Sequence, residues 1–182
     1  MSVRFVSNRS IPSYMAAADD YGYLNIRRNA HSIYYVPSYD HKGGMGDRRA
    51  FITATSTVSY DQGGPTEFVD GVMTGNTAYF GSQNIADKYI LFQFQLPVLI
   101  TEVTWHTNYA GTTYYWHFQG SQDNSSWTTL VDNIQITHAG NAQVIPVINT
   151  TEYLYYRWLG VSGNTAPSPR HYDMWFKIAG LD

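Results

Sequence analysis

The sequence predicts an all-β protein built as a sandwich or jelly roll, preceded by an extended N-terminal arm. About nine short runs of strand-forming residues follow one another from residue 50 onward, separated by Gly, Pro, Asn and Asp. No segment in this region has the apolar spacing of a long helix. At 182 residues the chain is long enough for one domain with a substantial core.

Composition narrows the classes of function. Hydrophobic residues make up 43% and charged residues 14%, which is a folded rather than a disordered composition. The 16 Tyr, 8 Phe and 5 Trp suit strands and surfaces that are half buried against another molecule. The net charge of −3 predicts no binding to nucleic acid. Cysteine is absent, which excludes disulfides, thiolate metal sites and a Cys nucleophile.

The first nine residues, MSVRFVSNR, contain no long apolar run. Nowhere in the chain do about 20 apolar residues follow one another, as a membrane helix requires. We therefore expect no signal peptide, no transmembrane segment and no membrane insertion, with assembly in a cytoplasm.

Alternation and turn residues place the individual strands. We predict strands over residues 50–55, 76–80, 89–96, 99–106, 114–121, 127–131, 143–148, 153–161 and 174–179. Residues 60–65, Tyr-Asp-Gln-Gly-Gly-Pro, predict a turn.

The N-terminal segment has a different character. Short strands are predicted over residues 23–26 and 32–36, and residues 41–47 form a Gly-rich linker. Apolar residues are too sparse here to build a second core. We therefore divide the chain into an arm, residues 1–49, and a sandwich domain, residues 50–182.

The stretch Trp116–Trp127 carries the most informative pattern. Tyr114, Trp116 and Phe118 share one face of a strand, because side chains alternate along it, and this aromatic face predicts a core position. The polar run Asp123–Ser126 then predicts a turn, and strand-forming residues resume after it.

This stretch resembles the discoidin domain, also called the coagulation factor V/VIII type C domain, a galactose-binding-like jelly roll related to many carbohydrate-binding modules. Residues 70–79 resemble the family's Asp-Gly and Asn-Thr-x-Trp segment, with Tyr79 in place of Trp. Ile90–Phe94, Ile100–Trp105 and Tyr153–Trp158 resemble three of its strands. The resemblance covers about residues 50–180 and implies a discoidin-like jelly-roll β-sandwich.

The resemblance also implies that ligands bind to loops at one end of the barrel. Those loops correspond here to residues 59–65, 81–88, 106–113 and 162–172. Aromatic and imidazole side chains in them can stack on a sugar ring, and polar ones can bond to hydroxyls. The candidate ligand-binding residues are Tyr60, Asp61, His106, Asn108, Tyr109, His171 and Tyr172. The alternative is that these are half-exposed aromatics and turn formers without a ligand.

Two features of the family are missing from the sequence. Many sugar-binding members carry an Arg soon after the strand matched by residues 99–106, where this chain reads His106-Thr107-Asn108. Membrane-binding members carry apolar spikes, whereas residues 59–63 read Ser-Tyr-Asp-Gln-Gly.

Members of the family often hold a structural calcium near the Asp-Gly segment. Asp70 and Thr77 are the candidate ligands here, together with backbone carbonyls. The Glu that the closing strand often supplies is absent from residues 173–176. The alternative is that Asp70 forms a turn before Gly71. No other cofactor is expected.

Catalytic patterns are absent from the sequence. No two His residues have the helical spacing of a zinc site, and there is neither a Gly-x-Ser-x-Gly elbow nor a phosphate loop. The acidic residues form no recognisable carboxylate pair. We therefore expect a protein that is not an enzyme.

Two functions are compatible with these observations. The first is a structural and adhesive subunit of a larger particle, a bacteriophage virion, in which residues 1–49 contact other virion subunits or copies of the chain. The abundant Tyr suits burial against neighbouring subunits, and many copies would strengthen weak binding to a host glycan. The alternative is a stand-alone carbohydrate-binding module that recognises a cell-surface glycan.

Overall fold

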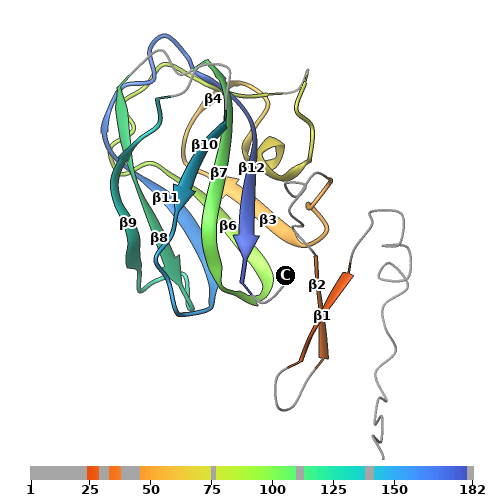
Figure 1. Cartoon of the computed structure of the whole chain (residues 1–182). Helices are drawn as coiled ribbons and strands as arrows, with labels where there is room; N and C mark the ends of the chain where they lie inside the picture. The colour runs from red at the N-terminus through yellow and green to blue at the C-terminus, as the bar shows by residue number, and fades with distance from the viewer. Residues whose placement is uncertain are drawn as a thin grey trace, which may run out of the picture.

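Figure 1 shows the computed structural model of the chain. The structure describes residues 24–28, 33–37, 46–74, 77–109, 113–137 and 142–179. For residues 24–28, 33–37, 108 and 109 this description covers the backbone alone.

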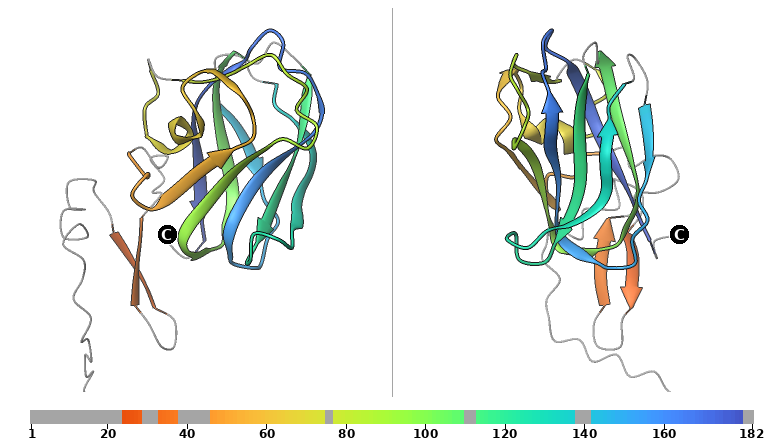
Figure 2. Two further views of the ribbon diagram at one scale, coloured as in Figure 1. Left: turned by 180° about the vertical axis from the view of Figure 1, so that it is seen from behind. Right: turned by 90° about the vertical axis from the view of Figure 1, so that its left-hand side faces the viewer.

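Two five-stranded antiparallel sheets pack face to face as a sandwich (Figures 1 and 2). The front sheet has the strand order β10-β7-β12-β5-β4, and its strands are β4 (Tyr60–Gln62), β5 (Ala78–Phe80), β7 (Ile100–Tyr109), β10 (Ala142–Pro146) and β12 (Arg170–Ile178). The back sheet has the order β3-β6-β11-β8-β9, and its strands are β3 (Ile52–Ser56), β6 (Tyr89–Val98), β8 (Tyr114–Ser121), β9 (Thr128–Gln135) and β11 (Tyr153–Gly163). A 3-10 helix, η2 (Pro65–Val69), contacts β12 and β3. The predicted discoidin-like jelly-roll sandwich is confirmed at the level of the fold.

The predicted strands are all found, with two differences in their limits that matter below. β12 begins at Arg170 rather than at residue 174, and β7 continues to Tyr109 rather than ending at residue 106. The predicted turn over residues 60–65 contains the short strand β4, which pairs with β5.

Within the predicted arm, β1 (Leu24–Arg28) and β2 (Ile33–Pro37) form an antiparallel hairpin, as their strand-forming residues predicted. The end of the predicted arm is different. Arg48 is 4% exposed, and its backbone N–H donates to the Val69 carbonyl (2.8 Å). Residues 46–49 therefore pack with the sandwich, which starts earlier than the predicted limit at residue 50.

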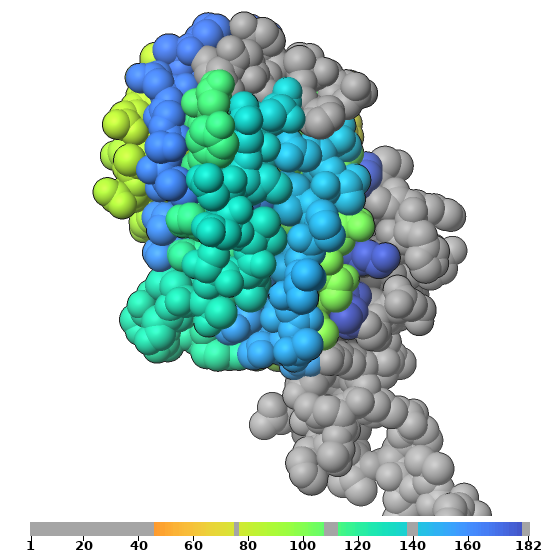
Figure 3. Space-filling model, turned by 60° about the vertical axis from the view of Figure 1, so that its left-hand side comes forward, coloured from red at the N-terminus to blue at the C-terminus, as the bar shows by residue number. Residues whose placement is uncertain are grey.

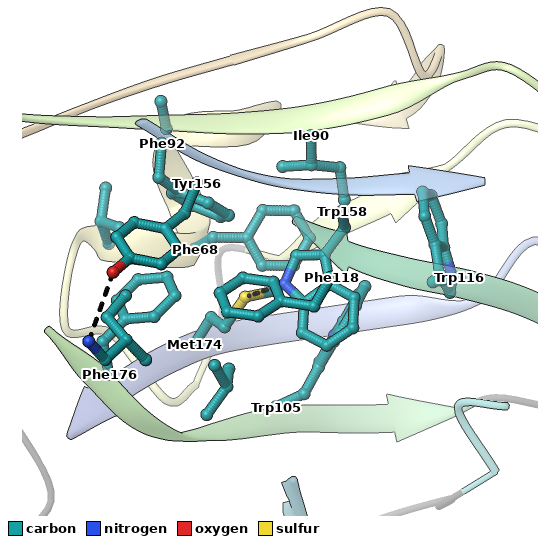
Figure 4. Packing of buried hydrophobic residues seen from close by; sticks show 14 of the residues in the cluster. Phe68, Ile90, Phe92, Trp105, Trp116, Phe118, Tyr156, Trp158, Met174 and Phe176 are labelled. Carbon is teal, nitrogen blue, oxygen red and sulfur yellow. Dashed lines mark hydrogen bonds between the residues drawn. The ribbon is translucent and has the colours of Figure 1, made fainter. Parts of the chain in front are cut away.

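An aromatic core fills the space between the two sheets (Figure 4). Trp105 of the front sheet faces Trp116 and Trp158 of the back sheet, with ring centroids 5.9 and 5.0 Å apart. Two polar atoms of the core rings find partners inside, whereas the buried Trp116 Nε1 has no hydrogen-bond partner among the described residues. Trp158 Nε1 donates to the Met174 sulfur (2.9 Å), and the Tyr156 hydroxyl donates to the Val98 carbonyl (2.6 Å). The alternation of aromatic residues in the sequence thus becomes the packing between the layers.

The turn between β8 and β9 has the chemistry that its polar residues predicted. Asp123 Oδ1 accepts hydrogen bonds from the backbone N–H groups of Ser125 (2.9 Å) and Ser126 (2.8 Å). These bonds hold the pKa of the Asp123 carboxyl far below its usual value. Asn124 takes a positive φ of 58° between them, which Asn tolerates better than most residues.

The edge strands β9 and β10 lie next to each other on one side of the sandwich (Figure 3). Gln143 of β10 connects the two sheets there. Its side-chain amide donates to the Gln135 carbonyl (2.9 Å) and accepts from the Thr137 N–H (3.1 Å). Among the described residues, no helix has the length and apolar character needed to cross a membrane.

Candidate functional site

The described parts of the four loops of the predicted ligand site lie at the upper end of the sandwich in Figure 1. Gln83 connects the first two. Its side-chain oxygen accepts from the Ser59 N–H (3.0 Å), and its amide nitrogen donates to the carbonyls of Ser59 (2.9 Å) and Gly81 (3.1 Å). The third and fourth loops meet where Gly163, the last residue of β11, lies against Thr113, the residue before β8. The contact is so close that an added Cβ at Gly163 would collide with the Thr113 carbonyl. We call this surface the loop end.

Thr165 holds the last loop against the second. Its side chain is fully buried, and its hydroxyl donates to the Gly81 carbonyl (2.5 Å) while accepting from the Gln83 N–H (3.0 Å). An isolated bridge between Asn84 and Asn164 lies beside it. Hydrogen bonds therefore join the first, second and fourth of these loops.

Asp61 is exposed at the loop end and accepts a hydrogen bond from the Ser168 hydroxyl (2.9 Å). Ser168 lies 3.4 Å from the hydroxyl of Ser82. A carboxylate beside two hydroxyls offers acceptors and donors of the kind that bind sugar hydroxyls. The role of Asp61 as a ligand-binding residue stays a prediction.

An Arg beside an aromatic ring lies on the front sheet next to the loop end. The Arg170 guanidinium lies over the Tyr79 ring, 4.8 Å from its centroid. In the front sheet, Tyr79 pairs with Gln62 on one side and with Arg170 on the other, and Arg170 pairs with Tyr109. A row of paired residues thus crosses β4, β5, β12 and β7.

Alternation explains why Tyr79 and Arg170 face outward. Ala78, Phe80 and His171, their neighbours along the strands, are buried in the core. None of the ion pairs found among the described residues includes Arg170. In many sugar-binding members of the resembled family an Arg follows the strand matched by residues 99–106. In this chain Arg170 reaches the same end of the sheet from the neighbouring strand β12.

His171 was predicted to contact a ligand, and this prediction is wrong. Its side chain is fully buried, because β12 begins at Arg170 and places the next side chain inside. His171 Nδ1 accepts from Trp105 Nε1 (2.9 Å), and Nε2 lies 3.4 Å from the Tyr114 hydroxyl. Burial lowers the pKa of His171 to about 3, so the ring is a neutral part of the core.

His106 is also removed from the surface. It is 8% exposed, and its ring lies 3.8 Å from that of Trp175, between centroids. The strand β7 continues past it, so His106 is not in a loop as predicted. Burial, and then the nearby positive charge of Arg48, lower its pKa to about 4. This packing leaves little of the ring for stacking on a sugar.

The remaining candidates divide between the core and the surface. The Tyr60 ring packs edge-on against Phe80 (centroids 5.5 Å apart), and burial raises the pKa of its hydroxyl, so it supports the loop end from inside. Tyr172 is half-buried on β12. Asn108 and Tyr109 end β7, where Tyr109 is paired with Arg170; their side chains lie outside the described residues.

The structure describes the surroundings of the two predicted calcium ligands, Asp70 and Thr77, only in part. Asp70 is 9% exposed and uses Oδ1 to accept the Val72 N–H (2.8 Å), which is the turn-forming role given as the alternative. Burial raises the pKa of its carboxyl. Thr77 is 8% exposed, and the neighbouring residues 75 and 76 lie outside the described part. In the part of the chain that the structure describes, no three His, Asp or Glu side chains cluster as metal ligands would.

Comparisons with known proteins connect this fold with carbohydrate-binding modules. No family model and no curated protein sequence matches the chain. Among solved structures, a family 32 carbohydrate-binding module of AlyQ in complex with 4,5-unsaturated mannuronic acid matches with a TM-score of 0.55 at 17% identity, over 69% of this chain and 94% of that module.

Two further modules of the same kind have similar scores. The family 32 module of NanJ from C. perfringens in complex with galactose matches with a TM-score of 0.56 at 8% identity, over 72% of this chain and 97% of that one. Another family 32 module from Clostridium perfringens, in complex with GalNAc-beta-1,3-galactose, matches with a TM-score of 0.54 at 11% identity, over 69% and 94%. At identities this low, the three matches show a shared jelly-roll fold and nothing beyond it.

Proposed function

We propose that this chain is a non-catalytic carbohydrate-binding module whose ligand site is the loop end. The observation that carries this proposal is the pair formed by Arg170 and Tyr79. An exposed guanidinium on β12 lies beside a half-exposed aromatic ring on β5, next to loops that the buried Thr165 hydroxyl joins by hydrogen bonds.

Each part of the loop end has a chemical role in this function. The Tyr79 ring offers an apolar surface to the C–H face of a sugar, and Arg170 donates directional hydrogen bonds to its oxygens. Asp61 and the hydroxyl of Ser168 accept from and donate to neighbouring sugar hydroxyls. Because Thr165 and Gln83 fix the loops beforehand, little conformational entropy is lost when the ligand binds.

The modules with similar folds support the choice of ligand class. Three such structures are complexes with 4,5-unsaturated mannuronic acid, with galactose and with GalNAc-beta-1,3-galactose. We infer that the ligand of this chain is likewise a sugar, bound by the loop end of the same type of sandwich.

A glycan array followed by calorimetry on variants tests the proposal. We expect the full chain to bind at least one glycan, and Arg170→Ala to weaken that binding by about tenfold or more, the worth of a hydrogen bond from a charged donor. Lys177→Ala is the matched control, since it removes an exposed positive charge from the same strand. Equal affinities for wild type and Arg170→Ala would contradict the placement of the site.

The hypothesis of a bacteriophage virion subunit, with residues 1–49 as its assembly element and the virion as its location, stays a prediction. The solved structures described above are carbohydrate-binding modules, which supports the alternative function better than this one. Comparing the oligomeric state of the full chain with that of residues 46–182 tests the assembly role of the arm. Equal, monomeric masses by light scattering would count against it.

A further inference from the structure

A second arginine is held in a fixed position on the outer face of the back sheet, which faces the viewer in the left view of Figure 2. Arg157 lies in β11, between the buried side chains of Tyr156 and Trp158, so its own side chain points outward. It lies six residues before Gly163 at the loop end, or about 20 Å along the strand at about 3.3 Å per residue. Arg157 and Arg170 therefore belong to separate surfaces.

Three contacts define the position of the Arg157 side chain. Its Nε donates to Gln119 Oε1 (2.8 Å), and the Gln119 amide donates in turn to the Thr129 hydroxyl (3.0 Å). The guanidinium lies over the ring of Trp127, 4.0 Å from its centroid. A guanidinium stacked on an indole and bonded at Nε keeps its plane fixed, with the terminal nitrogens directed to other partners.

The charge of Arg157 has no acidic counterpart among the described residues. The ion pairs found there involve Arg48, Arg49 and His117, and none includes Arg157. Partial burial lowers the pKa of its guanidinium, so the positive charge is held in a partly desolvated place. A fixed, partly desolvated cation without a counter-ion favours an anionic ligand.

The surroundings of Arg157 restrict what that ligand can be. In the pairing of β11 with β6, Leu91 lies opposite Arg157, and Tyr89 lies opposite Leu159. Tyr155 lies on the same face of β11, two residues before Arg157. These neighbours of Arg157 are all half-buried. Arg157 is the one Lys or Arg within the five strands of the back sheet. A surface with one cation among aromatic and aliphatic side chains fits a ligand with a single carboxylate per ring and an apolar ring face. Nucleic acids and highly sulfated polymers require several cations.

We propose that the outer face of the back sheet is a second binding site, where Arg157 and Trp127 take a uronic acid residue of an acidic polysaccharide. The terminal nitrogens of Arg157 bind the carboxylate through two parallel hydrogen bonds, and the sugar ring lies against the half-buried side chains beside it. The site is independent of the loop end, so it stands whether or not the loop end binds sugars.

The test uses the full chain with trigalacturonate as the probe and its methyl ester as the uncharged match. We expect wild type to bind trigalacturonate at least about tenfold more tightly than the ester, since the ester lacks the carboxylate charge. We expect Arg157→Gln to lose this preference and Arg170→Ala to keep it. Equal affinity for the two probes, no binding of trigalacturonate, or a preference lost in Arg170→Ala alone overturns the proposal.

An NMR titration of the wild type tests the same proposal without depending on the folding of Arg157→Gln. In an NMR titration with trigalacturonate, the indole N–H signal of Trp127, assigned with Trp127→Phe, should shift, whereas that of Trp175 should stay. An unmoved Trp127 signal at saturation contradicts the proposal. A polyglutamate peptide that binds as tightly as trigalacturonate would show that the surface takes acidic protein segments, and the sugar assignment would be wrong.

Discussion

Arg48 Nη2 donates a hydrogen bond to Asp173 Oδ1 inside the sandwich, where the two side chains are 5% and 0% exposed. Arg48 Nη1 also donates to the Met174 carbonyl (2.9 Å), and Asp173 accepts from Trp175 Nε1 (3.0 Å). Through this pair, the residues preceding β3 are connected to β12 of the other sheet. The pair explains why the sandwich includes residues that the sequence placed in the arm.

Breaking this ion pair should strongly destabilise the domain. Arg48→Met leaves the Asp173 carboxylate buried without its partner, and we expect a loss of about 3–5 kcal/mol in the free energy of unfolding. Urea unfolding followed by tryptophan fluorescence measures the loss. The control is Arg49→Met, whose ion pair with Asp47 is exposed and should contribute about 0–1 kcal/mol. Equal effects of the two substitutions would contradict the structural role given to Arg48.

The two buried imidazoles should make the domain sensitive to acid. Burial lowers the pKa of His171 to about 3 and that of His106 to about 4, against 6.5 for an ordinary His. Between pH 6.5 and 4 the unfolded state therefore binds more protons than the folded state. The free energy of unfolding is at its full value above pH 6.5, and falls as the pH drops, by about 1.4 kcal/mol per pH unit for each imidazole.

Substitution separates this effect from other acid effects. In His106→Gln, the slope of the free energy of unfolding against pH should become smaller by about one proton between pH 6.5 and 4. Urea titrations at several pH values measure the slope. An unchanged slope in His106→Gln and in His171→Gln would show that neither ring is held neutral by the fold.

Gly120 of β8 lies against the ring of Tyr153 in the neighbouring strand β11. An added Cβ at this position would enter the ring of Tyr153, so we expect Gly120→Ala to cost about 1–3 kcal/mol through overpacking. Gly64→Ala is the control, since the nearest atom to its Cβ would be Glu67 Oε2 at an ordinary 3.8 Å. Thermal unfolding of both variants is the measurement, and equal melting temperatures would contradict the packing described.

Thr165 should affect stability and sugar binding together. Thr165→Val keeps the shape of the side chain but leaves the Gln83 N–H without its hydroxyl partner, at a cost of about 1–3 kcal/mol. Because Thr165 also holds Gly81, the loops should become less ordered and glycan affinity should fall. Calorimetry with the glycan found on the array measures this. If the variant is destabilised but binds the glycan with unchanged affinity, the ligand does not depend on these loops, which would contradict the placement of the site.

Local patterns were sufficient to predict most of the fold. The alternation around Trp116 and the turn at Asp123 depend on neighbours in the sequence, and both are confirmed. The limits of β12 were harder to predict, because Pro167 and Pro169 indicate a loop while Arg170 and His171 already pair with β5. That pairing partner is distant in the sequence, so no local pattern contains it.

The location of the candidate site stays a prediction, and the structure places some of its residues differently from the sequence. His171 was assigned to a loop and lies in the core. β12 starts four residues before the predicted start at residue 174. Because side chains alternate along a strand, this earlier start places Arg170 on the outer face and His171 in the core. Arg157 and Trp127 meet across strands, which the sequence alone does not reveal.

The most direct test of the central claim is a crystal structure of the full chain with the glycan that binds best on the array. We expect the sugar at the loop end, with an oxygen within hydrogen-bond distance of the Arg170 guanidinium and the ring against Tyr79. A sugar bound elsewhere on the sandwich, with Arg170 and Tyr79 free of contact, would contradict the account.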